Sequence, residues 1–214
     1  MSVKIFFDMD GVLVDFSGGA ADAIQHALDV GDVTKKAIRR LVNYDGPDRE
    51  EPITAEFLDN TVAIKDAKGE RTKWMKRVSD AVFSIVGSGG HPYWSSLPAL
   101  PSYQTMIQTA VDLVGLENVY VCTAPVFDKT GGCESGKREW IAEHTEILPE
   151  NVFVTSDKGS VTTMFPNSTN ILIDDRKKYC DAWNGMGGIS IRHSSSNTAD
   201  TISNLRLIVN SHKS

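Results

Sequence analysis

Six side chains that can do chemistry follow short runs rich in β-branched and aromatic residues. They are, in chain order, Asp8, Asp10, Thr123, Lys158, Asp174 and Asp175. In an open α/β sheet, the carboxyl ends of the parallel strands meet at one edge, where ligands bind. If each run is a strand of one sheet, we expect four carboxylates, a hydroxyl and an ammonium group to converge there.

That set of groups suits the chemistry of a phosphate ester. Carboxylates packed together repel one another unless a cation compensates them, and Mg²⁺ takes a few carboxylates while it retains waters and phosphate oxygens. Thr123 and Lys158 suit a phosphate as hydrogen-bond donor and point charge. One carboxylate can attack phosphorus, and a second can handle protons. Asp8 and Asp10 are two residues apart before Gly11, which predicts two separate roles.

The pattern of elements predicts a doubly wound, Rossmann-like α/β fold with a mainly parallel five-stranded sheet. The predicted strands are Val3–Phe7, Val119–Cys122, Val152–Thr155, Ile171–Ile173 and Ile189–Ile191. The predicted helices between and after them are Ser102–Val114, Lys137–His144, Arg176–Trp183 and Thr198–Val209.

One connection is far longer than a βα loop needs, which is about two to six residues. We interpret residues 17–97 as an inserted, mainly helical cap, and residues 1–16 and 98–214 as the core. Within the cap we expect helices at Gly18–Leu28, Thr34–Val42 and Thr72–Ile85, and loops at Tyr44–Pro52 and Gly87–Pro98.

Composition limits the class of protein. The 214 residues are 41% hydrophobic and 23% charged, with a net charge of −6, as in an ordinary soluble domain and unlike a general nucleic-acid binder. No apolar run approaches the ~18 residues of a membrane span. Three cysteines without a CxxC pair, and a carboxylate as early as Asp8, favour a reducing cytoplasm over export.

Charge is unevenly distributed along the chain. Residues 35–77 hold eleven Lys and Arg against eight Asp and Glu, which leaves the rest of the chain strongly acidic. A solvated helical face explains this excess most simply. The functional alternative is a basic lid that attracts an anionic substrate.

The ordered motifs resemble those of the haloacid-dehalogenase-like phosphohydrolases, and most closely the 5′(3′)-deoxyribonucleotidases within them. The stretches that carry the resemblance are FFDMDGVLVDF at 6–16, VCTAP at 121–125, TSDK at 155–158 and ILIDDR at 171–176. The resemblance implies an Mg²⁺-dependent phosphatase with a cap. It departs from the family at Ala124, where a Ser is usual, so the chemistry is better supported than the substrate.

The resemblance also implies a role for each matching residue. Asp8 would be the nucleophile, and Asp10 the general acid and base. Thr123 and Lys158 would hold the phosphoryl group. The metal would be held by Asp8, Asp10 through its backbone carbonyl, Asp174 and Asp175. Phe16 would line the nucleotide pocket.

Two further segments allow more than one interpretation. Trp94, where the cap rejoins the core, could stack on a base or plug the junction by packing. Residues 131–138 approximate a P-loop, but Arg138 stands where Ser or Thr is needed. We interpret this segment as a flexible loop leading into a helix from Lys137, and Lys137 is an additional candidate for the site.

The leading functional hypothesis is hydrolysis of nucleoside monophosphates through phospho-Asp8. An alternative keeps the chemistry but acts on a sugar phosphate or a nucleic-acid 3′-phosphate end. An alternative of another class is a non-catalytic module that accepts a phosphoryl group or binds a nucleotide. The expected partner is a small molecule, with neither a polynucleotide nor a membrane, and a homodimer is among the assemblies left open.

Overall fold

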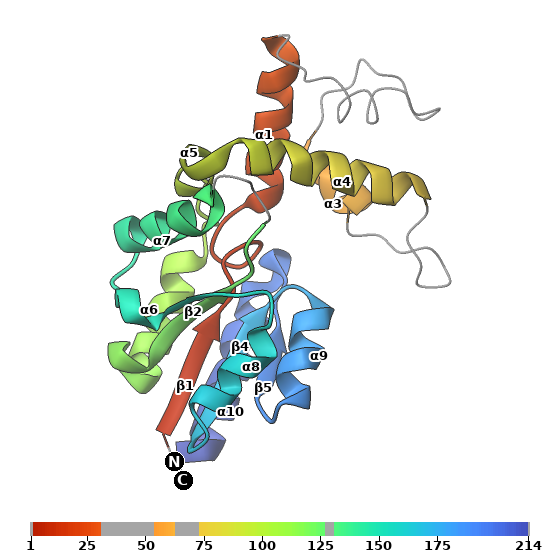
Figure 1. Ribbon diagram of the computed structural model, residues 1–214. Helices are drawn as coiled ribbons and strands as arrows, with labels where there is room; N and C mark the ends of the chain where they lie inside the picture. The colour runs from red at the N-terminus through yellow and green to blue at the C-terminus, as the bar shows by residue number, and fades with distance from the viewer. Residues whose placement is uncertain (1, 31–53, 63–72, 127–130, 214) are drawn as a thin grey trace.

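The computed structural model describes residues 2–30, 54–62, 73–126 and 131–213. Its centre is one parallel five-stranded sheet with the strand order β3-β2-β1-β4-β5 (Figure 1). The strands are β1 Ser2–Phe7, β2 Val119–Thr123, β3 Val152–Val154, β4 Ser168–Asp174 and β5 Ile189–Arg192. The predicted fold class and all five predicted strands are confirmed, and β4 begins three residues earlier than expected.

The register places the carboxyl ends of the three central strands level with one another. Phe7, the last residue of β1, is paired with Val121 of β2 on one side and with Ile173 of β4 on the other. The residues that follow these positions therefore lie at the same edge of the sheet. This alignment brings together side chains that lie more than a hundred residues apart in the sequence.

Helices cover both faces of the sheet, which is why the strands are apolar on both sides. The helices α6 (Tyr103–Val114) and α10 (Thr198–Lys213) pack on one face of the sheet, against side chains such as Ile5 and Phe7. On the other face, α8 (Lys158–Val161) and α9 (Lys177–Gly185) cover Phe6. Phe6 stacks on Tyr120 with ring centroids 4.7 Å apart. Short 3₁₀ turns lie at 116–118, 149–151, 162–164 and 195–197.

Among the described residues, four helices lie beyond the carboxyl edge of the sheet, between β1 and α6 (Figure 1). They are α1 (Phe16–Asp29), α3 (Ala55–Val62), α4 (Lys73–Ser88) and α5 (Gly90–Ser95). The helices α1, α3 and α4 pack on one another. The predicted helix at 34–42 and loop at 44–52 lie outside the described residues, as do most of the basic residues of 35–77. The division into a core and a cap at 17–97 stays a prediction.

The predicted loop Gly87–Pro98 is wrong over most of its length. The helix α4 continues to Ser88, and α5 follows within the Gly- and Pro-rich stretch. Pro92 is tolerated because it lies in the first turn of α5, where backbone N–H groups have no helical partner. Trp94 is fully buried, so its packing stabilises a turn that local propensity disfavours.

The helix α7 (Gly132–His144) begins five residues before the predicted start at Lys137. Its first turns lie directly against the backbone of α5, as Figure 1 also shows. A Cβ on Gly132 would lie 2.3 Å from the His91 nitrogen, and one on Gly136 would lie 2.6 Å from the His91 carbonyl oxygen. Only residues without a side chain allow this approach, so the glycines that suggested a flexible loop instead form a helix–helix contact.

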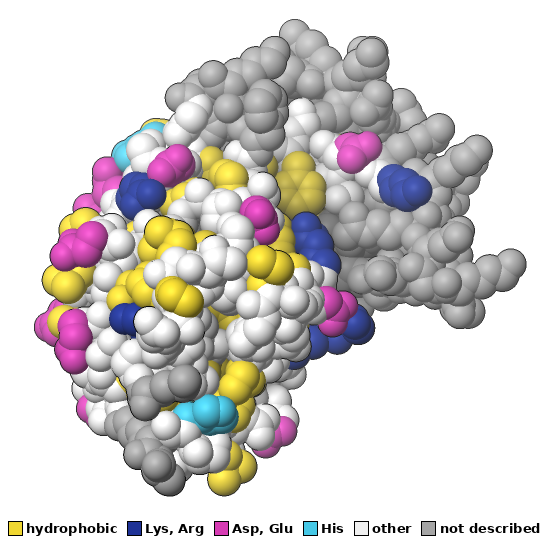
Figure 2. Space-filling model, turned by 60° about the horizontal axis from the view of Figure 1, so that its bottom comes forward, with side chains coloured by type: hydrophobic (Ala, Val, Ile, Leu, Met, Phe, Trp, Pro, Cys, Tyr) yellow, Lys and Arg dark blue, Asp and Glu magenta, His cyan; other side chains and the backbone are white. Residues whose placement is uncertain are grey.

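Charged side chains of both signs are dispersed over the face shown in Figure 2, which lies at the amino ends of the strands. Uncharged polar and hydrophobic side chains separate them there. Among the described residues, no helix is both long enough and apolar enough to cross a membrane.

The glycine contact between α5 and α7 leads to a first prediction. We expect Gly136→Ala to destabilise the protein by about 1–3 kcal/mol, because the new methyl group meets backbone atoms of α5. Thermal unfolding should show a fall in Tm of roughly 3–10 °C. The matched control is Gly185→Ala in α9, where a Cβ would meet nothing within 4 Å. Equal melting temperatures for the two variants would contradict the tight contact.

Candidate active site

The loop after β1 turns sharply and holds Asp8 and Asp10 at the carboxyl edge of the sheet. The Asp8 amide still donates to the Ile173 carbonyl of β4 at 2.9 Å, so Asp8 is anchored to the sheet. The chain then turns at Gly11, whose φ of +76° favours glycine. A Cβ at Gly11 would also lie 3.0 Å from Asp175 Oδ2. Glycine is thus favoured at position 11 both by the turn and by the closeness of Asp175.

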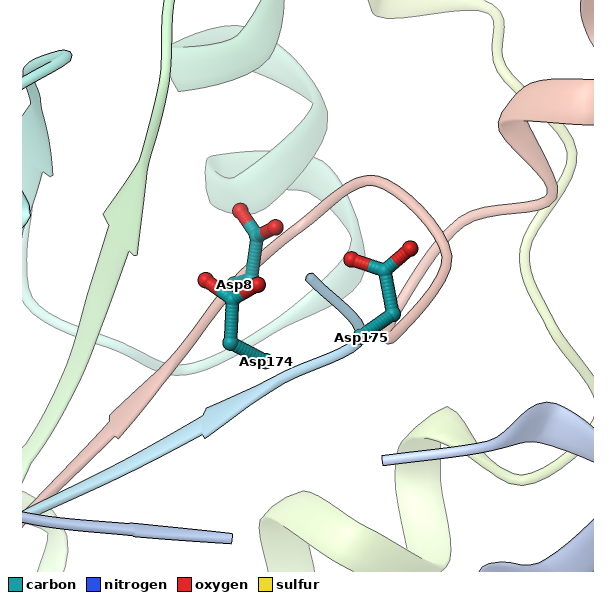
Figure 3. Close-up of side chains that lie close together, drawn as sticks. All are labelled: Asp8, Asp174 and Asp175. Atoms are coloured by element: carbon teal, nitrogen blue, oxygen red, sulfur yellow. The ribbon is translucent and has the colours of Figure 1, made fainter. Parts of the chain in front are cut away.

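Three of the predicted carboxylates form one cluster. Asp8 comes from the end of β1, and Asp174 and Asp175 come from the end of β4 (Figure 3). Each offers an oxygen, and these three oxygens lie within 4.8 Å of one another, a geometry that could hold a metal ion. All the ligand atoms are carboxylate oxygens, which suit a hard cation such as Mg²⁺. Asp175 Oδ1 is buried without a hydrogen-bond partner among the described residues, so it has a lone pair to offer.

The ammonium group of Lys158 binds two members of this cluster. It lies 2.8 Å from Asp8 Oδ1 and 2.6 Å from Asp174 Oδ2, and the lysine side chain is fully buried. The Tyr179 ring covers it, with Nζ 4.4 Å from the ring centroid. Lys158 reaches this position because Asp157 caps α8 by accepting from the Ser160 amide. One positive charge is therefore shared between two acids inside the protein.

Burial and mutual repulsion perturb the acids of the cluster. Burial, followed by repulsion from Asp8, raises the pKa of Asp174 to about 6, although Lys158 opposes this. Burial and the charges of Asp8 and Asp174 raise the pKa of Asp175 to about 7. Burial disfavours the charge of Lys158, but Asp8 and Asp174 outweigh it, so its pKa lies above the ordinary value. The acids of the cluster already bind the ammonium group of Lys158. Their raised pKa values favour the binding of a further cation or of a proton.

Asp10 takes a different partner from the other acids. Its Oδ2 accepts a hydrogen bond from Lys137 Nζ at 2.7 Å, and its Oδ1 is buried without a partner among the described residues. Burial raises the pKa of Asp10, Lys137 lowers it in part, and the net result is a pKa above its ordinary value. The carboxylate of Asp10 does not belong to the three-residue cluster, and the metal contact predicted through its backbone carbonyl stays a prediction.

Thr123 ends β2 next to these groups, and its hydroxyl oxygen accepts from Lys137 Nζ at 3.0 Å. Lys137 is the residue that sequence reasoning named only as an additional candidate. The structure places it fully buried and bound to Asp10 and Thr123. The signal that could have found it is its position in a helix: once α7 begins at Gly132, Lys137 follows Gly136 on the buried side.

The two predicted aromatic residues lie together beside the junction of α5 and α7. The rings of Phe16 and Trp94 are stacked, with centroids 6.0 Å apart, and Phe83 stacks on Phe16 at 6.0 Å. Trp94 is 0% exposed, which favours the packing interpretation over direct stacking on a base. Phe16 is partly exposed. Roles for both in substrate binding stay predictions.

Cys122 is an alternative nucleophile that the structure disfavours. It is fully buried in β2, and burial is the main cause that raises the pKa of its thiol to about 12. A thiol with such a pKa remains protonated and unreactive at neutral pH. This environment favours a packing role for Cys122.

The comparisons with known proteins give structural matches only. No protein-family model and no curated protein matches the chain. A HAD family hydrolase from Deinococcus radiodurans, solved with phosphate and sodium, is 15% identical with a TM-score of 0.45, covering 88% of this chain and 79% of its own. A hydrolase from Streptococcus pneumoniae is 13% identical with a TM-score of 0.46. The match covers 98% of this chain and 100% of that hydrolase.

A third match is a HAD family enzyme from Bacteroides thetaiotaomicron in complex with magnesium and inorganic phosphate. It is 11% identical with a TM-score of 0.42, covering 91% of this chain and 96% of its own. Matches this distant do not assign an activity to the chain. The function proposed below therefore rests on the residues of this chain.

The acidic cluster leads to a prediction about pH. Because the folded state raises the pKa values of Asp174 and Asp175 above the unfolded value of about 3.9, it binds protons more tightly than the unfolded chain between about pH 4 and 7. This contribution to stability is present at low pH and is lost as the pH rises through 6 and 7. We expect the Tm of chelator-treated protein to fall by roughly 3–8 °C from this cause between pH 5 and 7.5.

Calorimetry of two variants checks this cause. Asp175→Asn should flatten the fall in Tm, whereas Asp181→Asn, at an exposed residue of α9, should leave it as in the wild type. Adding Mg²⁺ should raise Tm more at pH 7.5 than at pH 5, because the carboxylates are deprotonated at the higher pH. A Tm response to Mg²⁺ that is the same at both values would contradict a metal site built from these acids.

Proposed function

We propose that this protein hydrolyses phosphate monoesters through a phospho-aspartate on Asp8. The observation that carries the proposal is the placement of Asp8: its carboxylate lies in a cluster of three acids, beside a buried lysine, at the carboxyl edge of a parallel sheet. Asp10 and Thr123 lie at the same edge. This arrangement offers a nucleophile, a proton donor and phosphate ligands to one substrate.

The reaction takes two steps that restore the enzyme. An oxygen of Asp8 attacks phosphorus, the bond to the ester oxygen breaks, and Asp10 gives its proton to the leaving alkoxide. The raised pKa of Asp10 suits this donor role. Water then attacks phospho-Asp8, Asp10 takes the proton of that water, and inorganic phosphate leaves with Asp8 regenerated. Lys158 balances the charge of Asp8 throughout, and the Thr123 hydroxyl binds a phosphoryl oxygen.

The three-acid cluster is the site for Mg²⁺ in this proposal. Asp8, Asp174 and Asp175 fit it because all their ligand atoms are oxygens and one of these is unpartnered. When bound, the ion supplies positive charge that reduces the repulsion between the phosphate ester and the surrounding carboxylates. Assay after treatment with a chelator, with and without added Mg²⁺, tests this requirement directly.

We further propose nucleoside monophosphates, and in particular 5′(3′)-deoxyribonucleotides, as the substrates. The support is the resemblance of the motif stretches and the partly exposed ring of Phe16, which stacks with Phe83. In this proposal residues 17–97 form the cap that closes over a small molecule in the cytoplasm. Sugar phosphates and nucleic-acid 3′-phosphate ends are the competing substrates.

Loss of the nucleophile tests the chemistry. We expect Asp8→Asn to lower kcat for every phosphate monoester by roughly 10⁴-fold, because the amide cannot form the phospho-enzyme. Asp181→Asn should retain wild-type turnover, since Asp181 is exposed and pairs with Lys177. Normal turnover by Asp8→Asn would refute the mechanism. A wild-type phospho-enzyme that lasts for hours without turnover would instead indicate a non-catalytic phospho-accepting module.

A phosphate-release screen tests the substrate. Purified protein with Mg²⁺ is given a panel of ribo- and deoxyribonucleoside 5′- and 3′-monophosphates, sugar phosphates and 3′-phosphorylated oligonucleotides. We expect the highest kcat/KM for a deoxyribonucleoside monophosphate. A sugar phosphate that exceeds every nucleotide would refute the nucleotidase proposal while leaving the phosphatase chemistry intact.

A further inference from the structure

Lys137 is a second buried lysine beside Asp10 and Thr123, and it takes no part in the bond-making and proton-transfer steps of the proposed reaction. Its side chain is 0% exposed. Its ammonium group donates to Asp10 Oδ2 at 2.7 Å, to Thr123 Oγ1 at 3.0 Å and to the Ala124 carbonyl at 2.9 Å. An ammonium group has three N–H donors. All three are engaged within the protein, so Lys137 has no donor left for a phosphate.

Its contact with Asp10 makes the two oxygens of that carboxylate unequal. Oδ2 is held by the charge of Lys137, whereas Oδ1 is shielded from solvent and has no hydrogen-bond partner among the described residues. A proton on the carboxylate therefore belongs on Oδ1, since Oδ2 already accepts from an ammonium donor. Lys137 thereby sets the orientation of the oxygen that transfers the proton.

Its contact with Thr123 orients the hydroxyl in the same way. The oxygen of Thr123 accepts from Lys137, so the hydroxyl proton must point away from the ammonium group. That proton is then available to a phosphoryl oxygen. The Ala124 carbonyl, as third acceptor, fixes the backbone of the same segment. One ammonium group thus aligns the proton donor and a phosphate ligand relative to each other.

The fold holds Lys137 in place from outside the site. The glycines of α7 allow its backbone to lie against α5, and Lys137 follows the second of them, Gly136. Trp94 of α5 covers the ammonium group, with Nζ 5.0 Å from the centre of the Trp94 ring. The full burial of Trp94 therefore serves the reaction indirectly, because it shields the contact between Lys137 and Asp10 from water.

We infer that Lys137 is a positioning residue of the phosphatase reaction: through its contacts with Asp10 Oδ2, Thr123 Oγ1 and the Ala124 carbonyl it aligns the group that protonates the leaving oxygen. This inference rests on the proposed function. Lys158 and Lys137 then have separate tasks. Lys158 balances the charge of the nucleophile, and Lys137 acts through Asp10.

The test compares two esters with different leaving groups in the Lys137→Met variant. The p-nitrophenolate leaves without a proton, whereas the alkoxide of a nucleoside 5′-monophosphate needs one from Asp10. The readout is the ratio of kcat/KM for the nucleotide to kcat/KM for p-nitrophenyl phosphate, in which equal effects on both esters cancel. We expect Lys137→Met to lower this ratio by about 100-fold, the usual size of general acid catalysis.

Controls separate this inference from the function itself. If the wild type hydrolyses neither ester, the proposed function is refuted before any variant is compared; if it hydrolyses only p-nitrophenyl phosphate, the best alkyl phosphate of the substrate panel replaces the nucleotide in the ratio. Lys177→Met, at an exposed lysine paired with Asp181, should leave the ratio unchanged. A Lys137→Met ratio within about 3-fold of the wild type would overturn the inference, even if both activities had fallen.

Lys137→Met leaves the charge of Asp10 buried without a partner, and such a charge can prevent a protein from folding. A double variant provides a second measurement for that case. Asp10→Asn combined with Lys137→Met removes both charges, and circular dichroism and thermal unfolding report its folding. Because Lys137 acts through Asp10, the double variant should keep the leaving-group ratio of Asp10→Asn within about 3-fold. A further 10-fold fall in that ratio would show an independent role and refute the inference.

Discussion

The repulsion between carboxylates at the carboxyl edge of the sheet is the constraint on which this site depends. Asp8, Asp174 and Asp175 are held within a few ångströms because they follow strands whose ends are level. Lys158 compensates part of their charge from within the protein. Burial, and then repulsion among the acids, raises the pKa values of Asp174 and Asp175. A divalent cation would compensate the negative charge that Lys158 leaves.

Two buried lysines meet this edge from two different helices. Lys158 begins α8, shortly after β3, and binds Asp8 and Asp174. Lys137 comes from α7, after β2, and binds the second acid of the loop. Because the two lysines come from different helices, Asp8 and Asp10 lie in distinct environments although they are only two residues apart. In the proposed reaction, these distinct environments let Asp8 act as the nucleophile while Asp10 carries a proton.

Local pattern was sufficient for the sheet but not for two glycine-rich segments, one before β2 and one after it. The strands could be predicted because each is a short run rich in β-branched and aromatic residues between turn residues. The loop expected at Gly87–Pro98 is largely the helix α5, and α7 begins at Gly132 instead of Lys137. In both places glycines suggested flexibility, but in α7 the role of Gly132 and Gly136 is to let the helix lie against the backbone of α5. Spacing within one sequence does not reveal which distant backbone a glycine faces.

By itself, the sequence determined the fold class and the edge of the sheet at which the acids lie, since each apolar strand run and the residues that follow it can be identified locally. Only the tertiary structure decided the partners of those acids. It showed that Lys137, distant in sequence from Asp10, is buried against it, and that Trp94 is covered by neighbouring groups. The reason is that the pairing of Lys137 with Asp10 depends on how α5 and α7 pack. Contacts between the two segments set this packing, and neither segment sets it alone.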